Sequence, residues 1–271
     1  MMDEGVPENF LSLRGIGFSA GRKAILSGID LDVGPGTVCG LVGPNGSGKS
    51  TLLKIIARQV APTSGSVAWN GRTAADWSNR AFARHVSYMP QFTPGADGMT
   101  VRELVALGRF PWHGTLGRFG EKDARAVEEA IARTELDDFA DRRVDEMSGG
   151  ERQRAWIAMM LAQDARCLIL DEPTSALDLA HQTGVLSLVR GLAEERGLTV
   201  IVVLHDINLA ARYCDRITAL NGGRILMSGP PAEIMRQEPL RQIFGVEMGV
   251  FEHPQHRQPV HDRFHALGHL D

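Results

Sequence analysis

The stretch Thr37–Thr51 reads TVCGLVGPNGSGKST, and it decides the fold. An apolar run ends at Val42, and Lys49 opens a pattern typical of a helix. The glycines between them, Gly43, Gly46 and Gly48, allow a tight turn and a close approach of the backbone to a ligand. Their spacing, followed by Lys-Ser, is typical of a phosphate-binding loop, in which N–H groups and a helix N-terminus face an anion. The alternative is an ordinary glycine-rich turn between a strand and a helix.

Two side chains of this stretch have a distinct expected role. The Lys49 ammonium would reach the β and γ phosphates of a nucleotide, and the Ser50 hydroxyl would ligate Mg²⁺. The residues predicted to bind the nucleotide are Gly43, Pro44, Asn45, Gly46, Ser47, Gly48, Lys49, Ser50 and Thr51.

Composition is that of an ordinary globular protein. The chain has 271 residues, of which 43% are hydrophobic and 23% charged, so it can form one large domain or one domain with an inserted lobe. The net charge of −4 gives no electrostatic reason to expect a nucleic-acid partner. The cysteines are three and widely spaced, which favours reduced buried thiols over a disulfide framework; they are Cys39, Cys167 and Cys214.

The sequence offers no membrane-targeting or membrane-spanning signal. Residues 1–9 are acidic and polar, unlike a secretory signal. The apolar run Val200–Leu204 is far shorter than the roughly 20 residues that a spanning helix needs. We therefore predict a soluble, cytosolic protein that contacts a membrane only through a partner.

Apolar periodicity predicts an α/β chain with an inserted helical block. Ile29, Leu31 and Val33 alternate with aspartates in the second of two strands expected in 11–33. A helix is expected to follow the loop as far as Val60, and 100–163 is helical in character. The predicted fold class is a P-loop NTPase core with an N-terminal antiparallel β subdomain and an inserted helical subdomain. The predicted boundaries are 8–250 for the whole domain, with 8–91 and 164–250 as core, 92–163 as the inserted lobe, and 251–271 as a His-rich tail.

A pair of carboxylates follows the apolar run Cys167–Leu170. Such a run is typical of a buried parallel strand, and ligands bind at the carboxyl ends of such strands. Asp171 is expected to hold Mg²⁺ beside Ser50, and Glu172 to act as general base, a role worth about 10²–10⁴ in rate. The alternative is that both carboxylates merely solvate a strand end.

The motif MSGGERQ occupies Met147–Gln153. Ser148 and Glu151 have the spacing of a helix capping box, which is one interpretation. The serine and the two glycines at a helix N-terminus also suit an anion, which is the other. A second phosphate-binding helix end on a different lobe would not reach the same nucleotide within one chain, so this interpretation points to two chains enclosing it.

Together these motifs resemble the ABC-transporter ATPase family over about residues 10–250. The matching positions are Gly43–Thr51, Gln91, Ser148, Gly149, Gly150, Glu151, Asp171, Glu172, Asp178 and His205. The resemblance implies ATP with Mg²⁺, and a head-to-tail dimer of two copies in which each ATP lies between one copy's loop and the other's Ser148 motif.

The resemblance also implies roles for three further residues. Gln91 would couple the γ-phosphate and Mg²⁺ to the helical lobe, so the expected metal-site residues are Ser50, Gln91 and Asp171. Asp178 would lie in the loop that crosses the dimer interface. His205 would contact the γ-phosphate and position the attacking water with Glu172.

Three segments resemble more closely the ATPase of ferric hydroxamate siderophore importers. They are LGRFPWHGTLGRFG (107–120), Met147–Gln182 and Val203–Ile217. The resemblance implies a peripheral subunit on the cytoplasmic face of the cell (inner) membrane, bound to a separate permease that receives an iron(III)-siderophore from a binding protein. Heme and vitamin B12 importer ATPases are near relatives and remain alternatives.

Two rivals from other classes fit less well. A soluble ABC ATPase acting on nucleic acid or ribosomes would lead us to expect tandem cassettes, a coiled-coil insert or a basic patch. A P-loop kinase leaves Ser148–Glu151 and His205 unexplained.

Three aromatic residues of the 107–120 segment have two interpretations. Phe110, Trp112 and Phe119 either form an exposed docking patch for the permease or fill the core of the small lobe. Substitution of Trp112 separates the two, because a core role predicts equal loss of association and thermal stability.

The chain departs from the family pattern at the adenine position and in its tail. Ala20 aligns where the family usually has an aromatic residue, and Phe18 lies two residues earlier. Stacking on adenine, worth roughly 1–3 kcal/mol, is therefore in question, while ATP is still expected to bind.

Histidines recur in the tail at His253, His256, His261, His265 and His269. The last three have the spacing of one helix face, and the tail is either a metal sensor or a polar appendage.

Overall fold

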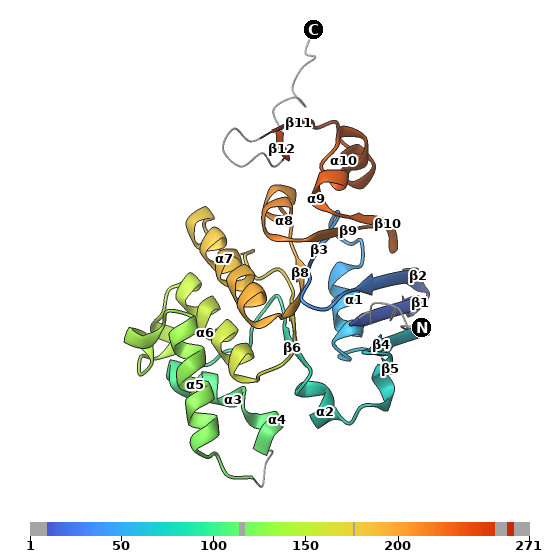
Figure 1. The fold of residues 1–271 in the computed structure, drawn as a ribbon. Helices are drawn as coiled ribbons and strands as arrows, with labels where there is room; N and C mark the ends of the chain where they lie inside the picture. Colours follow the sequence, from blue (N-terminus) through green and yellow to red (C-terminus); the bar gives the residue numbers. More distant parts are fainter. Residues whose placement is uncertain (1–9, 114–116, 176, 253–258, 263–271) are drawn as a thin grey trace, which may run out of the picture. The chain divides into compact units, whose positions relative to one another are not determined.

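The structure is a computed structural model that describes residues 10–113, 117–175, 177–252 and 259–262 (Figure 1). These residues form two compact units. The first contains 10–75, 199–252 and 259–262, and the second contains 76–113, 117–175 and 177–198.

The first unit begins with an antiparallel sheet in the order β2-β1-β4-β5. The strands are β1 Leu11–Ala20, β2 Lys23–Val33, β4 Ser64–Trp69 and β5 Arg72–Thr73. The predicted alternation in β2 is confirmed, since Ile29, Leu31 and Val33 are buried while the intervening aspartates are exposed. Asn70 and Gly71 both have positive φ, as a two-residue hairpin turn between β4 and β5 requires.

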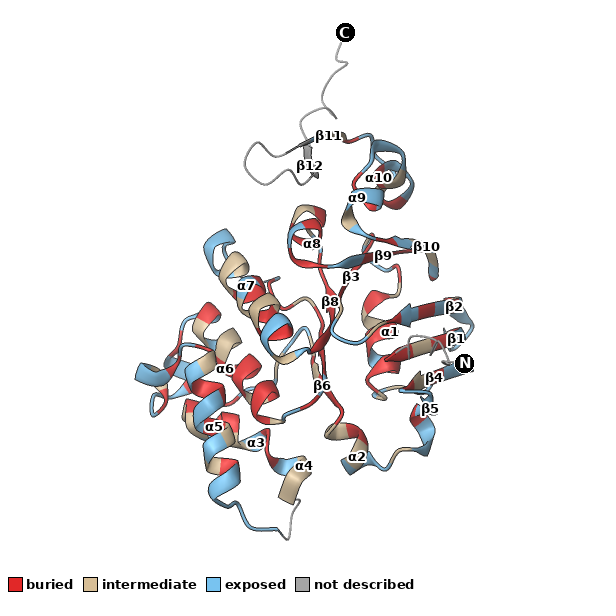
Figure 2. Ribbon diagram, viewed as in Figure 1, coloured by how far each residue is buried: buried red, intermediate tan, exposed pale blue. Residues whose placement is uncertain are grey.

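The first unit also holds four strands in the order β10-β9-β3-β8. They are β3 Val38–Val42, β8 Thr199–Val203, β9 Arg216–Asn221 and β10 Arg224–Gly229. β3 is parallel to both β8 and β9, and β10 is antiparallel to β9. Every residue of β3 and β8 is buried (Figure 2), as their unbroken apolar sequences predict.

Helices of the first unit follow these strands. They are α1 Lys49–Ile56, α8 Ile207–Tyr213, α9 Pro231–Ile234 and α10 Gln237–Phe244. The prediction that the first helix extends to Val60 is wrong, because α1 ends at Ile56 and Arg58 adopts a left-handed conformation with φ 57°.

The tail contributes a strand pair, β11 Gly249–Glu252 and β12 Pro259–Asp262. His261 lies in β12, so the expected arrangement of three tail histidines on one helix face is wrong. The remaining tail histidines, His253, His256, His265 and His269, lie outside the described residues.

The second unit pairs β6 Val86–Met89 with β7 Cys167–Leu170 in parallel. Its helices are α2 Asn79–Ala83, α3 Val101–Leu107, α4 Phe110–His113, α5 Glu121–Arg133, α6 Gly149–Ala162 and α7 Leu179–Arg196. Short 3-10 turns span Asp137–Phe139 and Val144–Glu146. α5 buries one side, with Val127, Ala130 and Ile131, and exposes the other (Figure 2).

Among the described residues, no helix combines the length and the apolar character needed to cross a membrane. All three cysteines are buried thiols, and burial raises the pKa of Cys39 to about 11.

Candidate active site

The loop after β3 requires glycine at two positions for reasons of packing. Gly43 has φ 139°, and a Cβ there would lie 2.0 Å from the Leu220 carbonyl oxygen. Gly48 has φ 103°, and its Cβ would lie 2.6 Å from Leu26 Cδ2. Gly46 differs, because it has φ 76° yet a Cβ would meet no atom within 4 Å. The loop therefore packs on its own fold at two glycines and opens into free space at the third.

The end of α1 that this loop reaches suits an anion. Gly48 is the N-cap, no side chain caps the helix, and its first turn contains no acidic residue. The first N–H groups of a helix have no partner within the helix, and together with the helix dipole they favour a negative charge. Within the described residues, the buried Ser47 Oγ has no hydrogen-bond partner. The loop thus fits a phosphate by its open space, its N–H groups and a buried hydroxyl.

Lys49 brings a positive charge to the same loop. Its side chain is 5% exposed, and Nζ donates to the carbonyl oxygens of Gly43 at 2.9 Å and Pro44 at 3.1 Å. Because the ammonium is held against the loop backbone, it lies where a phosphate on the α1 N-terminus would be neutralised.

His205 comes to the same edge of the sheet as this loop. Leu41 of β3 pairs with Val203 of β8, and Gly43 and His205 each lie two residues beyond that pair. The Leu204 N–H donates to the Leu41 carbonyl at 3.1 Å, which continues the pairing toward this edge. His205 is exposed, and it precedes Asp206, the N-cap of α8.

The second unit brings together the predicted residues Gln91, Asp171 and Glu172. Both carboxylates follow β7, and the Asp171 N–H donates to the Met89 carbonyl of β6 at 3.0 Å. Gln91 Nε2 donates to Glu172 Oε2 at 2.5 Å. Glu172 has φ 52°, a left-handed conformation that costs a non-glycine residue roughly 1–3 kcal/mol and tends to occur at functional sites.

Asp171 is almost fully buried, with 2% of its surface exposed, next to Tyr88 of β6. Burial and then the neighbouring Asp171 charge raise the pKa of the Tyr88 hydroxyl to about 12. A buried carboxylate at the end of a parallel strand is of the ligand type that Mg²⁺ prefers. Tyr88 was not predicted from sequence; its position on the strand beside β7 is the only local signal for it.

The motif at Ser148 forms the predicted capping box. Ser148 Oγ accepts from the Glu151 N–H at 3.3 Å, and Glu151 Oε2 accepts from the Ser148 N–H at 2.8 Å. That backbone N–H, with the Ser148 hydroxyl, lowers the pKa of Glu151. Gly149 and Gly150 follow as the first two residues of α6. Ser148 and Gly149 are exposed while Gly150 is buried, so capping occurs together with a partly exposed N-terminus and the two interpretations of this motif are compatible.

Asp178 is the N-cap of α7. Its Oδ1 accepts from the His181 N–H at 2.9 Å and lies 2.8 Å from His181 Nδ1. The backbone N–H of His181 and then its ring hold the pKa of Asp178 below its usual value. His181 was not predicted as a site residue, although its position three residues after an N-cap aspartate is a local signal.

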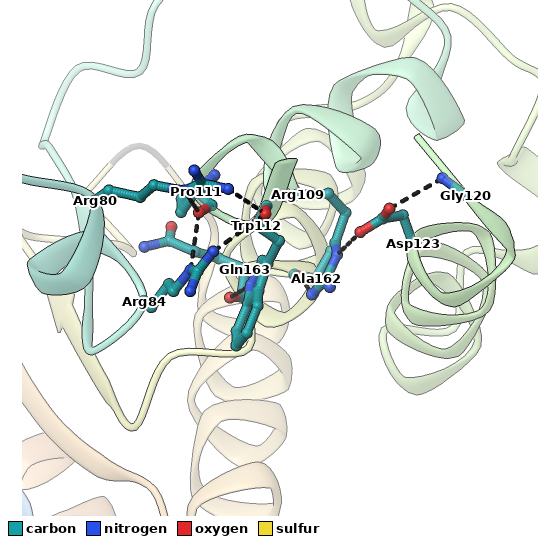
Figure 3. Close-up of polar contacts among 9 residues, drawn as sticks. All are labelled: Arg80, Arg84, Arg109, Pro111, Trp112, Gly120, Asp123, Ala162 and Gln163. Atoms are coloured by element: carbon teal, nitrogen blue, oxygen red, sulfur yellow. Dashed lines mark hydrogen bonds and ion pairs between the residues drawn. The ribbon is translucent and has the colours of Figure 1, made fainter. Parts of the chain in front are cut away.

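The aromatic residues of the 107–120 segment separate into two groups. Phe110 and Phe119 are 53% and 47% exposed. Trp112 is instead fixed within the unit, because its Nε1 donates to the Gln163 carbonyl at 2.8 Å and the Arg84 guanidinium lies 4.6 Å from the ring centroid (Figure 3).

A buried ion pair lies beside Trp112. Arg109 Nε donates to Asp123 Oδ1 at 2.9 Å, and Nη1 donates to the Ala162 carbonyl at 2.7 Å (Figure 3). The Arg109 guanidinium also lies 5.0 Å from the Trp112 ring centroid.

At the position where the sequence predicts a contact with adenine, Ala20 is exposed at the β1–β2 turn and Phe18 is half-buried in β1.

Comparison with known proteins gives consistent relatives. A family model described as ABC transporter matches residues 26–175. The achromobactin transport ATP-binding protein CbrD of Dickeya dadantii is 42% identical over 88% of this chain and 88% of its own length. The hemin import ATP-binding protein HmuV of Streptomyces coelicolor is 45% identical over 89% and 85%. The iron(3+)-hydroxamate import ATP-binding protein FhuC of Bacillus subtilis is 38% identical over 93% and 94%.

Solved structures agree with these relatives. A chain of a structure described as a metal-chelate type ABC transporter in an inward-facing conformation superposes with a TM-score of 0.83 and 26% identity, covering 94% of this chain and 97% of that one. The ATP-binding cassette MJ0796, in a dimeric post-hydrolysis state bound to ADP and Pi, has a TM-score of 0.70 and 29% identity over 81% and 98%. The chain therefore belongs to the ABC transporter family, as an ATP-binding ATPase whose activity is coupled to transport.

Proposed function

We propose that this protein is the ATP-hydrolysing subunit of an importer for iron(III)-siderophore complexes, of the hydroxamate type. The observation that carries the proposal is the near full-length similarity to proteins named for achromobactin transport and iron(3+)-hydroxamate import. Heme is a second candidate cargo, favoured by the 45% identity to a hemin import protein. Vitamin B12 is a further candidate that rests on sequence resemblance alone.

The proposed nucleotide site starts at the loop after β3. Lys49 and the N–H groups at the start of α1 hold the β and γ phosphates, and the open space at Gly46 receives them. His205, at the same sheet edge, holds the γ-phosphate. Pro44, Asn45, Ser47 and Thr51 complete the loop.

Hydrolysis requires a metal site, a general base and a residue that orients the attacking water. Ser50, Gln91 and Asp171 would hold Mg²⁺, which when bound would neutralise charge developing on the phosphates. Glu172 accepts a proton from the attacking water, and His205 orients that water. The hydrogen bond from Gln91 to Glu172 supports a shared place for these two side chains.

A second copy of the chain completes each site in a head-to-tail dimer. Its Ser148, Gly149, Gly150 and Glu151 cover the phosphates with the first N–H groups of α6, and its Asp178 crosses the interface. The exposed Ser148 and Gly149 at the start of α6 and the dimeric cassette with a similar fold support this arrangement.

The dimer works beneath a membrane permease at the cytoplasmic face of the inner membrane, and the permease receives its cargo from a siderophore-binding protein. Phe110 and Phe119 are proposed to contact the permease, because exposed aromatic side chains close together mark interaction sites. The His113 ring lies 6.3 Å from Phe110 and 6.2 Å from Phe119, so the three form one aromatic row.

Growth under iron limitation tests this function. A strain lacking the gene is supplied with a ferric hydroxamate, a ferric catecholate or heme, and carries the wild-type protein, the Glu172→Gln variant or no protein. Restored growth on the hydroxamate with wild type alone is expected. Growth restored only on heme would overturn the siderophore cargo in favour of the second candidate, and no dependence on any source would refute both.

A further inference from the structure

The second glycine of the Ser148 motif is confined by a histidine from another helix. A Cβ added at Gly150 would lie 2.4 Å from His181 Cδ2 and 3.0 Å from His181 Cγ. Real Cβ atoms do not approach other heavy atoms to 2.4 Å, so any larger residue at this position must displace the ring. The neighbouring Gly149 is not confined in this way, since its Cβ would lie at an ordinary 3.4 Å from Leu177 Cδ2.

The same ring is tied to Asp178. Nδ1 lies 2.8 Å from Asp178 Oδ1, and the same oxygen accepts from the His181 N–H at 2.9 Å. Since a carboxylate oxygen accepts, Nδ1 carries the hydrogen and the ring orientation is fixed. The imidazole therefore contacts the first turn of α6 on one edge and the N-cap of α7 on the other.

We propose that His181 is a positioning residue that holds the Ser148–Glu151 motif and Asp178 in one fixed arrangement. The inference rests on the proposed function, in which both groups act on a second chain. A fixed spacing matters there because two groups that must dock together lose less conformational freedom when they are already in place. It also gives Gly150 a structural reason to be glycine, in addition to any close approach of a phosphate.

This role predicts that a substitution of His181 weakens dimerisation and leaves the affinity for Mg·ATP unchanged. The His181→Ala variant keeps the loop after β3, so its affinity for Mg·ATP and its thermal midpoint stay at wild-type values. ATP-driven dimerisation, measured by light scattering in the Glu172→Gln background, weakens about tenfold, the expected effect of losing one hydrogen bond to a charged group. The kcat of the same substitution in the wild-type background falls by a similar factor.

Double variants test whether position 150 must be glycine because of the His181 ring or because of a phosphate that lies close to it. Gly150→Ala alone should impair dimerisation, and in the His181→Asn background the methyl should add little, because asparagine is smaller and still donates to Asp178. Gly149→Ala is the matched control, since its effect should be the same with either residue at position 181. His181→Asn alone should restore most of the dimerisation lost in His181→Ala.

Three results would overturn the inference. They are wild-type dimerisation and kcat in His181→Ala, loss of ATP affinity or thermal stability in that variant, and a full additive penalty of Gly150→Ala with asparagine at 181. Absence of ATP binding and dimerisation in the protein without substitutions at these sites would instead refute the proposed function.

Discussion

Gly46 provides a direct test of the loop as a phosphate site. Its φ of 76° lies in the left-handed region, and a Cβ there meets no atom within 4 Å. Gly46→Ala therefore adds backbone strain of about 1–2 kcal/mol without a clash. For a chain of this size we expect a fall in thermal midpoint of about 2–4 °C per kcal/mol.

The same methyl occupies the open space into which the phosphates are proposed to bind. We expect the dissociation constant for Mg·ATP, measured by calorimetry, to rise at least about tenfold, equivalent to about 1.4 kcal/mol. Both effects are measured on the full chain, so strain and lost binding are obtained from one preparation.

Gly245→Ala is the matched control. Gly245 has φ 74°, ends α10, and a Cβ there also meets no atom within 4 Å. We expect Gly245→Ala to show a similar fall in thermal midpoint and to bind ATP with wild-type affinity. If Gly46→Ala binds ATP as tightly as Gly245→Ala, the open space at Gly46 is not where a phosphate lies.

Three further predictions concern catalysis, docking and stability. Glu172→Gln should form a stable ATP-bound dimer with phosphate release slowed at least about 10²-fold, and near-normal release would rule out the general base. Phe110→Ser should weaken permease association with an unchanged thermal midpoint, whereas Trp112→Ala should lower both; equal losses for Phe110→Ser would instead assign it to the core. Burial alone would raise the pKa of Asp123, but hydrogen bonds from a backbone N–H and from Arg109 keep it below 3.8. Its stabilisation is then complete above pH 3.8 and is lost as pH falls through the lowered pKa, so the difference in urea unfolding free energy between wild type and Asp123→Asn should shrink in that range and stay constant above it.

Local signals predicted most of the elements. The capping boxes at Thr100 and Ser148 join residues three apart, so sequence spacing alone determines them. The end of α1 was mispredicted because apolar periodicity continues to Val60 while Arg58 turns left-handed. The position of His261 was mispredicted because β12 depends on pairing with β11, a contact that a four-residue repeat cannot reveal.

The candidate site was predictable to the extent that its residues follow strand ends. Gly43, Asp171 and His205 each come just after a buried apolar run, and parallel pairing places such a residue at the carboxyl end of the strands within its own unit. The contact of His181 with Gly150 joins two helices, so no spacing rule predicts it. The roles proposed for these residues remain predictions, to be tested by the substitutions above.

The polar network at α4 explains how a four-residue helix can hold Phe110 in the solvent. So short a helix is not stable by its own hydrogen bonds. Arg80 and Arg84 instead donate to the carbonyl oxygens of Pro111 and Trp112 and so tie this segment to α2 (Figure 3).

Trp112 completes the anchoring of this segment, and its role differs from that of its exposed neighbours. Its ring lies between two guanidinium groups and its N–H is bound, so it belongs to the support of the segment. The rings of Phe110 and Phe119 instead lie beside His113, and both keep about half of their surface exposed. A backbone already ordered saves part of the cost of binding, which is about 0.5–1.5 kcal/mol for each side chain immobilised. An exposed aromatic side chain on an anchored backbone, as at Phe110, therefore favours a docking surface over an incompletely packed core, and the predicted contrast between Phe110→Ser and Trp112→Ala follows from this difference.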